Sequence, residues 1–252
     1  MALCAPAAAQ FRPVPPVDGM KPHAGLGPTV IPRPVKEKAA PPPPPVETIP
    51  FDYESLNAIP RDFTILIGDL QIAQVGGARG ALFDGARFVP GTPSYMLADK
   101  VHSLFGADTP TFLNGIQGHA TYPLAVLKHE CAKANEVSLR FVLLGGKARA
   151  AGIAFGIAPD ASYWVAAVRG DSLQLSRVVN GVAKPLSHAG TSVGVKRAHT
   201  IDLRLKDRAV TVVLDGRTRI ARLVDVPPSG RCGLWSEGDS KVLFDEFVVK
   251  RK

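Results

Sequence analysis

Gly233–Lys252 reads GLWSEGDSKVLFDEFVVKRK, and this pattern is typical of two β-strands joined by a turn. The apolar run GLW comes first. Ser236–Ser240 follows, with a composition typical of a turn. Apolar residues then return at alternate positions, beginning with Val242 and Phe244. We predict a β-hairpin that closes a β-sandwich.

The same alternation extends upstream. Val137, Leu139 and Phe141 alternate with polar residues, as expected for a half-buried strand. The dipeptides Asn180–Gly181 and Asp215–Gly216 are favoured in tight hairpin turns. Short strands joined by such turns predict an all-β protein, with an antiparallel β-sandwich or jelly roll.

Helical spacing is rare in this sequence. Only Met96–Leu104 and Ala125–Asn135 approach it, and either segment could be a short helix or a turn. Tyr122–Lys128, which overlaps the second segment, also reads as a strand. For residues 77–117, which are rich in Gly and Pro, we expect short strands and long loops.

The segment GLWSEGDSKVLFDEFVV resembles the last two strands of bacterial domains in the concanavalin A-like lectin/glucanase superfamily. Within it, the resemblance is greatest to laminin-G-like and 3-keto-disaccharide hydrolase-like domains. It continues through AVTVVLDGRTRIARL, AGIAFGIAPDASYWVAAVRG and NEVSLRF, and thus covers residues 135–252. The opening of such a domain resembles FDYESLNAIPRDFTILIGDLQIAQV, residues 51–75. The resemblance implies a concanavalin A-like jelly roll and a role involving glycans.

The chain divides into three parts by composition. Ala7–Ala9 before Gln10 fit a signal-peptidase site, so we interpret residues 1–9 as the remnant of a signal peptide whose start lies upstream. An Ala-rich disordered start is the alternative. We expect residues 10–49 to be a proline-rich disordered linker, acting as a tether or as a ligand for a proline-recognition domain. Residues 50–252 form the folded domain, and we expect a periplasmic or extracellular bacterial protein.

Charge, hydropathy and cysteine content limit the possible binding partners of the protein and the state of its thiols. The formal net charge is +8, but no basic run has interleaved aromatic residues, so we expect no nucleic-acid partner. The sequence contains no apolar run of about 18 residues, so we expect no integral membrane segment. Cys4 lies in the N-terminal segment. Cys131 and Cys232 either form a disulfide in an oxidising compartment or remain two buried thiols. The sequence does not indicate an oligomeric state.

No catalytic residues are predicted. Glycan hydrolysis needs two carboxylates flanking one bond, and glucanases of this superfamily use the pattern E-x-D-x-x-E. Glu237 and Asp239 match its start, but the second Glu is missing, so we interpret them as a solvated acidic turn. Asp245 and Glu246 are adjacent, and in an extended strand they point to opposite faces.

No metal-ligand spacing of His and Cys residues is present, and no cofactor is predicted. Calcium is possible, because its oxygen ligands can come from loops that are distant in sequence. The candidate calcium ligands are Asp160, Asp171 and Asp239.

For carbohydrate binding, the best local set is Tyr163, Trp164 and Arg169, because a sugar site combines an aromatic ring with hydrogen-bonding groups. Tyr163 and Arg169 share one face of the expected strand, and Trp164 lies on the other, where it is either core or exposed. The domains that this stretch resembles tend to have arginines at the positions of Gly156 and Ala167. That departure argues against a polar site of the same type.

Two functions follow from these observations. The first is an exported non-catalytic module for carbohydrate binding or adhesion, because a sandwich pattern occurs without a paired-carboxylate motif. The second, implied by the resemblance alone, is a glycan-processing hydrolase similar to 3-keto-disaccharide hydrolases. Carbohydrate is the expected partner in both.

Overall fold

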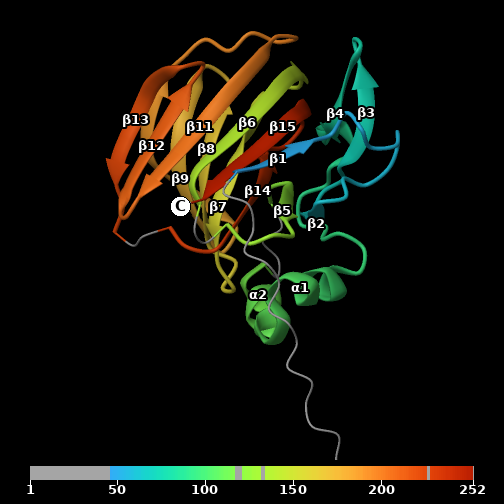
Figure 1. Cartoon of the computed structure of the whole chain (residues 1–252). Helices are drawn as coiled ribbons and strands as arrows, with labels where there is room; N and C mark the ends of the chain where they lie inside the picture. Colours follow the sequence, from blue (N-terminus) through green and yellow to red (C-terminus); the bar gives the residue numbers. More distant parts are fainter. Residues whose placement is uncertain (1–45, 117–120, 132–133, 226–227, 252) are drawn as a thin grey trace, which may run out of the picture. The chain divides into compact units, whose positions relative to one another are not determined.

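The computed structural model describes residues 46–116, 121–131, 134–225 and 228–251, which form two antiparallel β-sheets packed face to face (Figure 1). Sheet A has eight strands and sheet B has seven. The predicted all-β antiparallel sandwich is therefore confirmed.

Sheet A has the strand order β13-β12-β11-β6-β15-β4-β3, and β1 pairs with β15. Its strands are β1 (Val46–Pro50), β3 (Gln71–Val75), β4 (Ala78–Asp84), β6 (Ala134–Gly145), β11 (Ala198–Lys206), β12 (Ala209–Leu214), β13 (Arg217–Leu223) and β15 (Lys241–Arg251).

Sheet B has the strand order β10-β9-β8-β7-β14-β5-β2. Its strands are β2 (Phe63–Ile67), β5 (Leu124–Leu127), β7 (Ala150–Ile157), β8 (Tyr163–Arg169), β9 (Ser172–Val179), β10 (Val182–Gly190) and β14 (Arg231–Ser236).

The core between the sheets comes from the alternating pattern seen in the sequence. In β6, Val137, Leu139, Phe141 and Leu143 are buried while their neighbours are more exposed. They pack with inward residues of sheet B in one continuous apolar cluster. The cluster is large enough to stabilise a domain of this size through burial of apolar surface.

The predicted closing hairpin is wrong in one respect. Strand β14 lies in sheet B and β15 in sheet A, so the turn between them crosses from one sheet to the other. Gly85 N–H donates to Ser240 O, which joins this crossing to the end of β4. A hairpin and a crossing between sheets have the same local alternation of residues, so the sequence pattern did not distinguish them.

The two dipeptide turns are confirmed as hairpins. Strand β9 pairs with β10 around Asn180–Gly181, and β12 pairs with β13 around Asp215–Gly216. All four residues have positive φ, between 49° and 75°, as the favoured hairpin turn requires.

Short helices occupy much of the segment for which we expected strands and loops. They are η1 (Gly85–Arg87), α1 (Leu97–Phe105), η2 (Gly106–Asp108) and α2 (Thr109–Ile116). Helix α1 settles the open alternative for Met96–Leu104, whereas α2 was not predicted. Helix α2 has only eight residues, which include a proline and a glycine. Its buried residues are Phe112 and Ile116, so the helical spacing of apolar residues is too short to be recognised in the sequence.

The N-terminal boundary of the domain differs from the expected residue 50. Strand β1 begins at Val46, inside the predicted linker of residues 10–49, and pairs with β15 from Val46↔Lys250 to Pro50↔Glu246. Predictions for the signal remnant at residues 1–9 and for the rest of the linker lie outside the described residues. In the described part of the chain, no helix has the length and apolarity needed to span a membrane.

Candidate functional site

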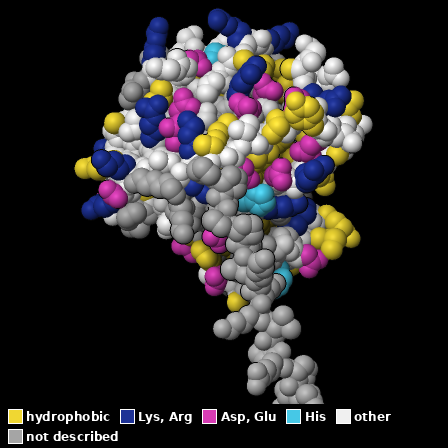
Figure 2. Space-filling model, viewed as in Figure 1, with side chains coloured by type: hydrophobic (Ala, Val, Ile, Leu, Met, Phe, Trp, Pro, Cys, Tyr) yellow, Lys and Arg dark blue, Asp and Glu magenta, His cyan; other side chains and the backbone are white. Residues whose placement is uncertain are grey.

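The outer face of sheet A carries charges of both signs that neutralise each other. Arg140 forms an ion pair with Asp245 at 2.9 Å, and Glu136 pairs with both Lys250 and Arg204. Figure 2 shows basic and acidic side chains interspersed over this face. Such paired surface charges are typical of a solvated face and give no single-sign patch for a ligand.

The outer face of sheet B is apolar and covered by α1 and α2, which lie beside it (Figure 1). The helices bury Val101 and Phe112 against sheet residues that include Trp235 and Val165. The Tyr122 ring also contacts Trp235, with 5.2 Å between the ring centroids. The covered part of this face is therefore closed to a ligand.

Two of the three predicted sugar-binding residues are buried on opposite faces of sheet B. Tyr163 is 4% exposed on the outer face, where burial raises the pKa of its hydroxyl and the nearby Trp235 indole opposes this. Trp164 is 6% exposed on the inner face, and the Arg177 guanidinium lies 4.4 Å from its ring centroid. Neither ring can stack on a sugar from solvent.

Arg169, the third predicted residue, shares the outer face with Tyr163 but is bonded to protein groups. Its guanidinium donates to both carboxylate oxygens of Glu237 and to the Gln174 side-chain oxygen at 3.2 Å. The structure thus places Tyr163, Trp164 and Arg169 in three different surroundings and does not combine them into one site.

The acidic turn has a structural role that the sequence analysis missed. The Asp239 carboxylate accepts hydrogen bonds from the backbone N–H groups of Lys147 and Ala148 at 3.0–3.1 Å. These bonds from Ala148 and Lys147 lower the pKa of Asp239. Asp239 is exposed in a turn, as interpreted from the sequence, but its carboxylate also holds the neighbouring Lys147–Ala148 backbone.

The candidate calcium ligands do not converge. Asp160 accepts a hydrogen bond from Ser162 N–H at 2.9 Å, Asp171 lies 3.6 Å from Arg149, and Asp239 caps a turn. The described residues include no group of three or more His, Cys, Asp or Glu side chains arranged for a metal ion.

A cleft of about 290 Å³ lies where α1, η2 and β14 meet, and we call it the Arg231 cleft. Its size is near the lower end of small-molecule sites, roughly 300 Å³. The residues that line it are Leu104, Phe105, Asp108, Glu130, Ile157, Pro159, Gly230 and Arg231.

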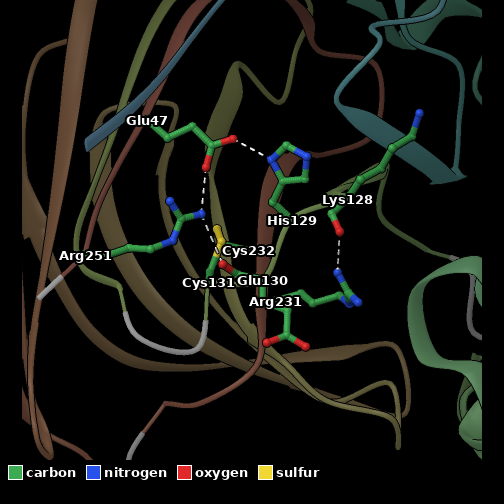
Figure 3. Close-up of a disulfide and its surroundings, with 8 residues drawn as sticks. All are labelled: Glu47, Lys128, His129, Glu130, Cys131, Arg231, Cys232 and Arg251. Atoms are coloured by element: carbon green, nitrogen blue, oxygen red, sulfur yellow. Dashed lines mark hydrogen bonds and ion pairs between the residues drawn. A yellow bond between two sulfur atoms is a disulfide. The ribbon is translucent and has the colours of Figure 1, made fainter. Parts of the chain in front are cut away.

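The disulfide between Cys131 and Cys232 positions two residues of this cleft, Glu130 and Arg231 (Figure 3). Each directly precedes one of the cysteines. The two Cα atoms of the disulfide are 5.7 Å apart, although 101 positions separate them in sequence. The alternative of two separate thiols is therefore excluded in this structure, and the bond brings a carboxylate and a guanidinium to one cleft.

Arg231 is fixed by the surrounding backbone. Its guanidinium donates to Lys128 O at 2.8 Å and to Leu104 O at 2.5 Å, which ties the end of β5 to the end of α1. It also lies 5.6 Å from the centroid of the Phe105 ring. Burial lowers the pKa of Arg231, and the nearby Glu130 carboxylate opposes this effect.

The carboxylates of Asp108 and Glu130 also line the cleft, and that of Glu130 lies near enough to Arg231 to act on its charge. Both residues are exposed, and neither side chain forms a hydrogen bond or ion pair with another residue in the described ranges. The cleft thus combines an aromatic ring, a fixed guanidinium and two hydrogen-bond acceptors. This combination suits a ligand that has hydroxyl groups and an apolar ring face.

No local sequence pattern marks this cleft, because its residues come from four separate segments. The two cysteines were the sequence feature that could have indicated this cleft. A bond between Cys131 and Cys232 brings the preceding residues, Glu130 and Arg231, near each other. Asp108 and Phe105 had no comparable signal, since they depend on the packing of α1 and η2.

Solved structures with similar folds were found, whereas no family profile and no curated protein matched the sequence. The carbohydrate-binding module CBM66 from Bacillus subtilis has a TM-score of 0.52 at 15% identity, covering 73% of this chain and 92% of that one. The apo Crh5 transglycosylase has a TM-score of 0.53 at 11% identity, with 82% and 85% covered. A Bacillus licheniformis β-glucanase has a TM-score of 0.52 at 7% identity, with 83% and 99% covered.

These similarities establish the fold. The chain shares its two-sheet β-sandwich fold, which the resemblance implied, with a carbohydrate-binding module, a transglycosylase and a β-glucanase. Identities of 15% or less do not transfer an activity, so function has to be argued from the chain's own clefts.

Proposed function

We propose that the domain is a non-catalytic carbohydrate-binding module whose ligand occupies the Arg231 cleft. The observation that carries the proposal is the combination of the Phe105 ring with the unpaired carboxylates of Asp108 and Glu130. A sugar presents hydroxyl donors to carboxylates and apolar carbons to the partly exposed Phe105 side chain. The Phe105 ring itself stacks on Phe112, with 4.7 Å between the ring centroids, and lies 5.6 Å from the Arg231 guanidinium. The fold supports the proposal, since CBM66 shares it.

We also propose that the protein is exported, to the periplasm or the cell exterior, as a laminin-G-like adhesion or binding module. The Cys131–Cys232 disulfide supports this, because such bonds persist in oxidising compartments and are rare in the cytosol. In this proposal, the proline-rich residues preceding β1 tether the domain.

A second function, glycan hydrolysis, is favoured by one observation: two carboxylates, Asp108 and Glu130, line the same cleft. Retaining and inverting glycosidases both use such a pair. However, both side chains are exposed, whereas a carboxyl group that acts as a general acid is commonly set in apolar surroundings. The non-catalytic proposal is therefore the stronger one.

A glycan array followed by a turnover assay separates the two functions. The array identifies a binding oligosaccharide, and the assay uses that oligosaccharide together with normal and 3-keto disaccharides. We expect binding without turnover, and weaker binding in Asp108→Asn and Glu130→Gln. Asp202→Asn on β11 of sheet A is the matched control. Turnover that Glu130→Gln abolishes would instead establish the hydrolase.

A further inference from the structure

A second cleft, of about 330 Å³, lies along α1 and is lined by residues different from those of the Arg231 cleft. We call it the Lys100 groove. The residues that line it are Ile59, Phe63, Thr64, Ile65, Met96, Asp99, Lys100, Ser103 and Lys128. Neither the disulfide nor any residue of the proposed sugar site contributes to it.

The groove is apolar along its rim. Phe63 and Ile65 of β2 also line the groove, although they are almost fully buried because their side chains belong to the core between the sheets. At the rim, Ile59 is 61% exposed and Met96 is 53% exposed. The preceding residue, Tyr95, is 85% exposed. Large apolar side chains that are exposed around a cleft indicate a ligand-binding surface, because a protein in water normally buries such side chains.

Two of the three charged residues that line the groove, Lys100 and Lys128, are cationic. The Lys100 ammonium forms no hydrogen bond or ion pair with any residue in the described part of the chain. Burial lowers the pKa of Lys100, and the more distant Asp69 opposes this only by electrostatic attraction. Lys128 donates to Arg61 O at 2.5 Å. Asp99 is the one acidic residue among those that line the groove.

We propose that the Lys100 groove binds an anionic amphiphile, with a carboxylate or similar head group on Lys100 and an apolar chain along Ile59 and Met96. A half-buried, unpaired ammonium loses hydration without gaining a partner, and an anion supplies that partner. A neutral ligand covers the same apolar surface but leaves Lys100 unpaired. The charge therefore selects an anionic head group.

Titration calorimetry with decanoate, below the concentration at which it forms micelles, tests this proposal. Decyldimethylphosphine oxide, which has a ten-carbon chain and a neutral head group without a sugar, is the comparison ligand. We expect decanoate to bind more tightly than decyldimethylphosphine oxide. Lys100→Met should weaken decanoate binding about tenfold, the cost of one charge-assisted hydrogen bond. Lys100→Arg should retain it, and Lys184→Met on β10 is the matched control.

The apolar half of the groove needs its own variant. Met96→Ser should weaken binding of both ligands, and a thermal melt of each variant establishes that it is folded. The proposal is overturned if decanoate does not bind, if decyldimethylphosphine oxide binds equally well, or if Lys100→Met binds decanoate as tightly as the unaltered protein. All three outcomes are independent of whether the Arg231 cleft binds a sugar.

Discussion

Cys131 and Cys232 form a disulfide between the segment that follows β5 and strand β14, and thereby hold Glu130 and Arg231 at the same cleft. The same region anchors the start of the domain. The Glu47 side chain on β1 bonds to Arg251 and to His129 at 2.6 Å each, and His129 lies two residues before Cys131 (Figure 3). One cluster of contacts thus joins the first strand, the last strand and the cleft.

Reducing the Cys131–Cys232 bond should destabilise the domain, because the bond closes a loop spanning 101 positions of sequence. Loss of a native disulfide typically costs about 2–5 kcal/mol of unfolding free energy. Urea unfolding with and without reductant measures the effect. The double variant Cys131→Ala/Cys232→Ala should show no further response to reductant. Two reactive thiols at these positions in the native, unreduced protein would contradict the prediction.

Trp235→Ala should strongly destabilise the domain, since the indole is buried between sheet B and α1–α2. Truncating a buried aromatic residue typically costs about 3–5 kcal/mol. Tyr95→Ala is the control, because that ring is exposed and its loss should leave the melting temperature almost unchanged. Equal melting temperatures for the two variants would mean that Trp235 does not hold the helices on the sheet.

Asp239→Ala should lower the melting temperature at neutral pH, because the Lys147 and Ala148 N–H groups lose their acceptor. Since these bonds lower the folded-state pKa of Asp239, its contribution is present above the ordinary value of 3.8 and is lost as the pH falls below it. Thermal melts between pH 7 and pH 2.5 should therefore show the two proteins converging. A pH-independent difference would indicate a cause other than the carboxylate.

Glu47→Gln should make stability less dependent on pH in the acidic range. Burial alone would raise the pKa of Glu47, but hydrogen bonds from His129 and Arg251 outweigh it and lower the pKa below 4.5. The stabilisation is therefore present above pH 4.5 and lost as the pH falls through the folded-state value.

Urea unfolding at pH 7 and pH 3 tests the Glu47 prediction. The variant should be less stable than the unaltered protein at pH 7, and the difference should shrink at pH 3. Glu246→Gln, also at the β1–β15 pairing, is the control. A difference that grows on acidification would have the wrong sign for a carboxylate with a lowered pKa.

Local patterns predicted the sheets well because a half-buried strand and a two-residue hairpin each leave a short-range signature. The alternation around Leu139 and the turns at Asn180–Gly181 and Asp215–Gly216 are examples. The path of the chain between the sheets has no such signature. The turn at Ser236–Ser240 was therefore taken for a hairpin when it connects sheet B to sheet A.

The candidate site was less predictable because it depends on tertiary packing. The strand pattern placed Tyr163 and Arg169 on one face correctly, but only the structure shows that α1 and α2 cover that face. Because the helices cover this part of sheet B, the candidate binding sites are clefts along α1 and not an open sheet surface. The segment that decides where a ligand can bind was thus the one with the weakest sequence pattern.

The most direct test of the carbohydrate-binding proposal is titration calorimetry with the oligosaccharide that the array selects. We expect saturable binding that falls about tenfold in Glu130→Gln and in Asp108→Asn, as for loss of one hydrogen bond to a charged group. Asp202→Asn should bind like the unaltered protein. Unchanged affinity in both cleft variants, with all proteins folded, would contradict the assignment of the Arg231 cleft as the sugar site.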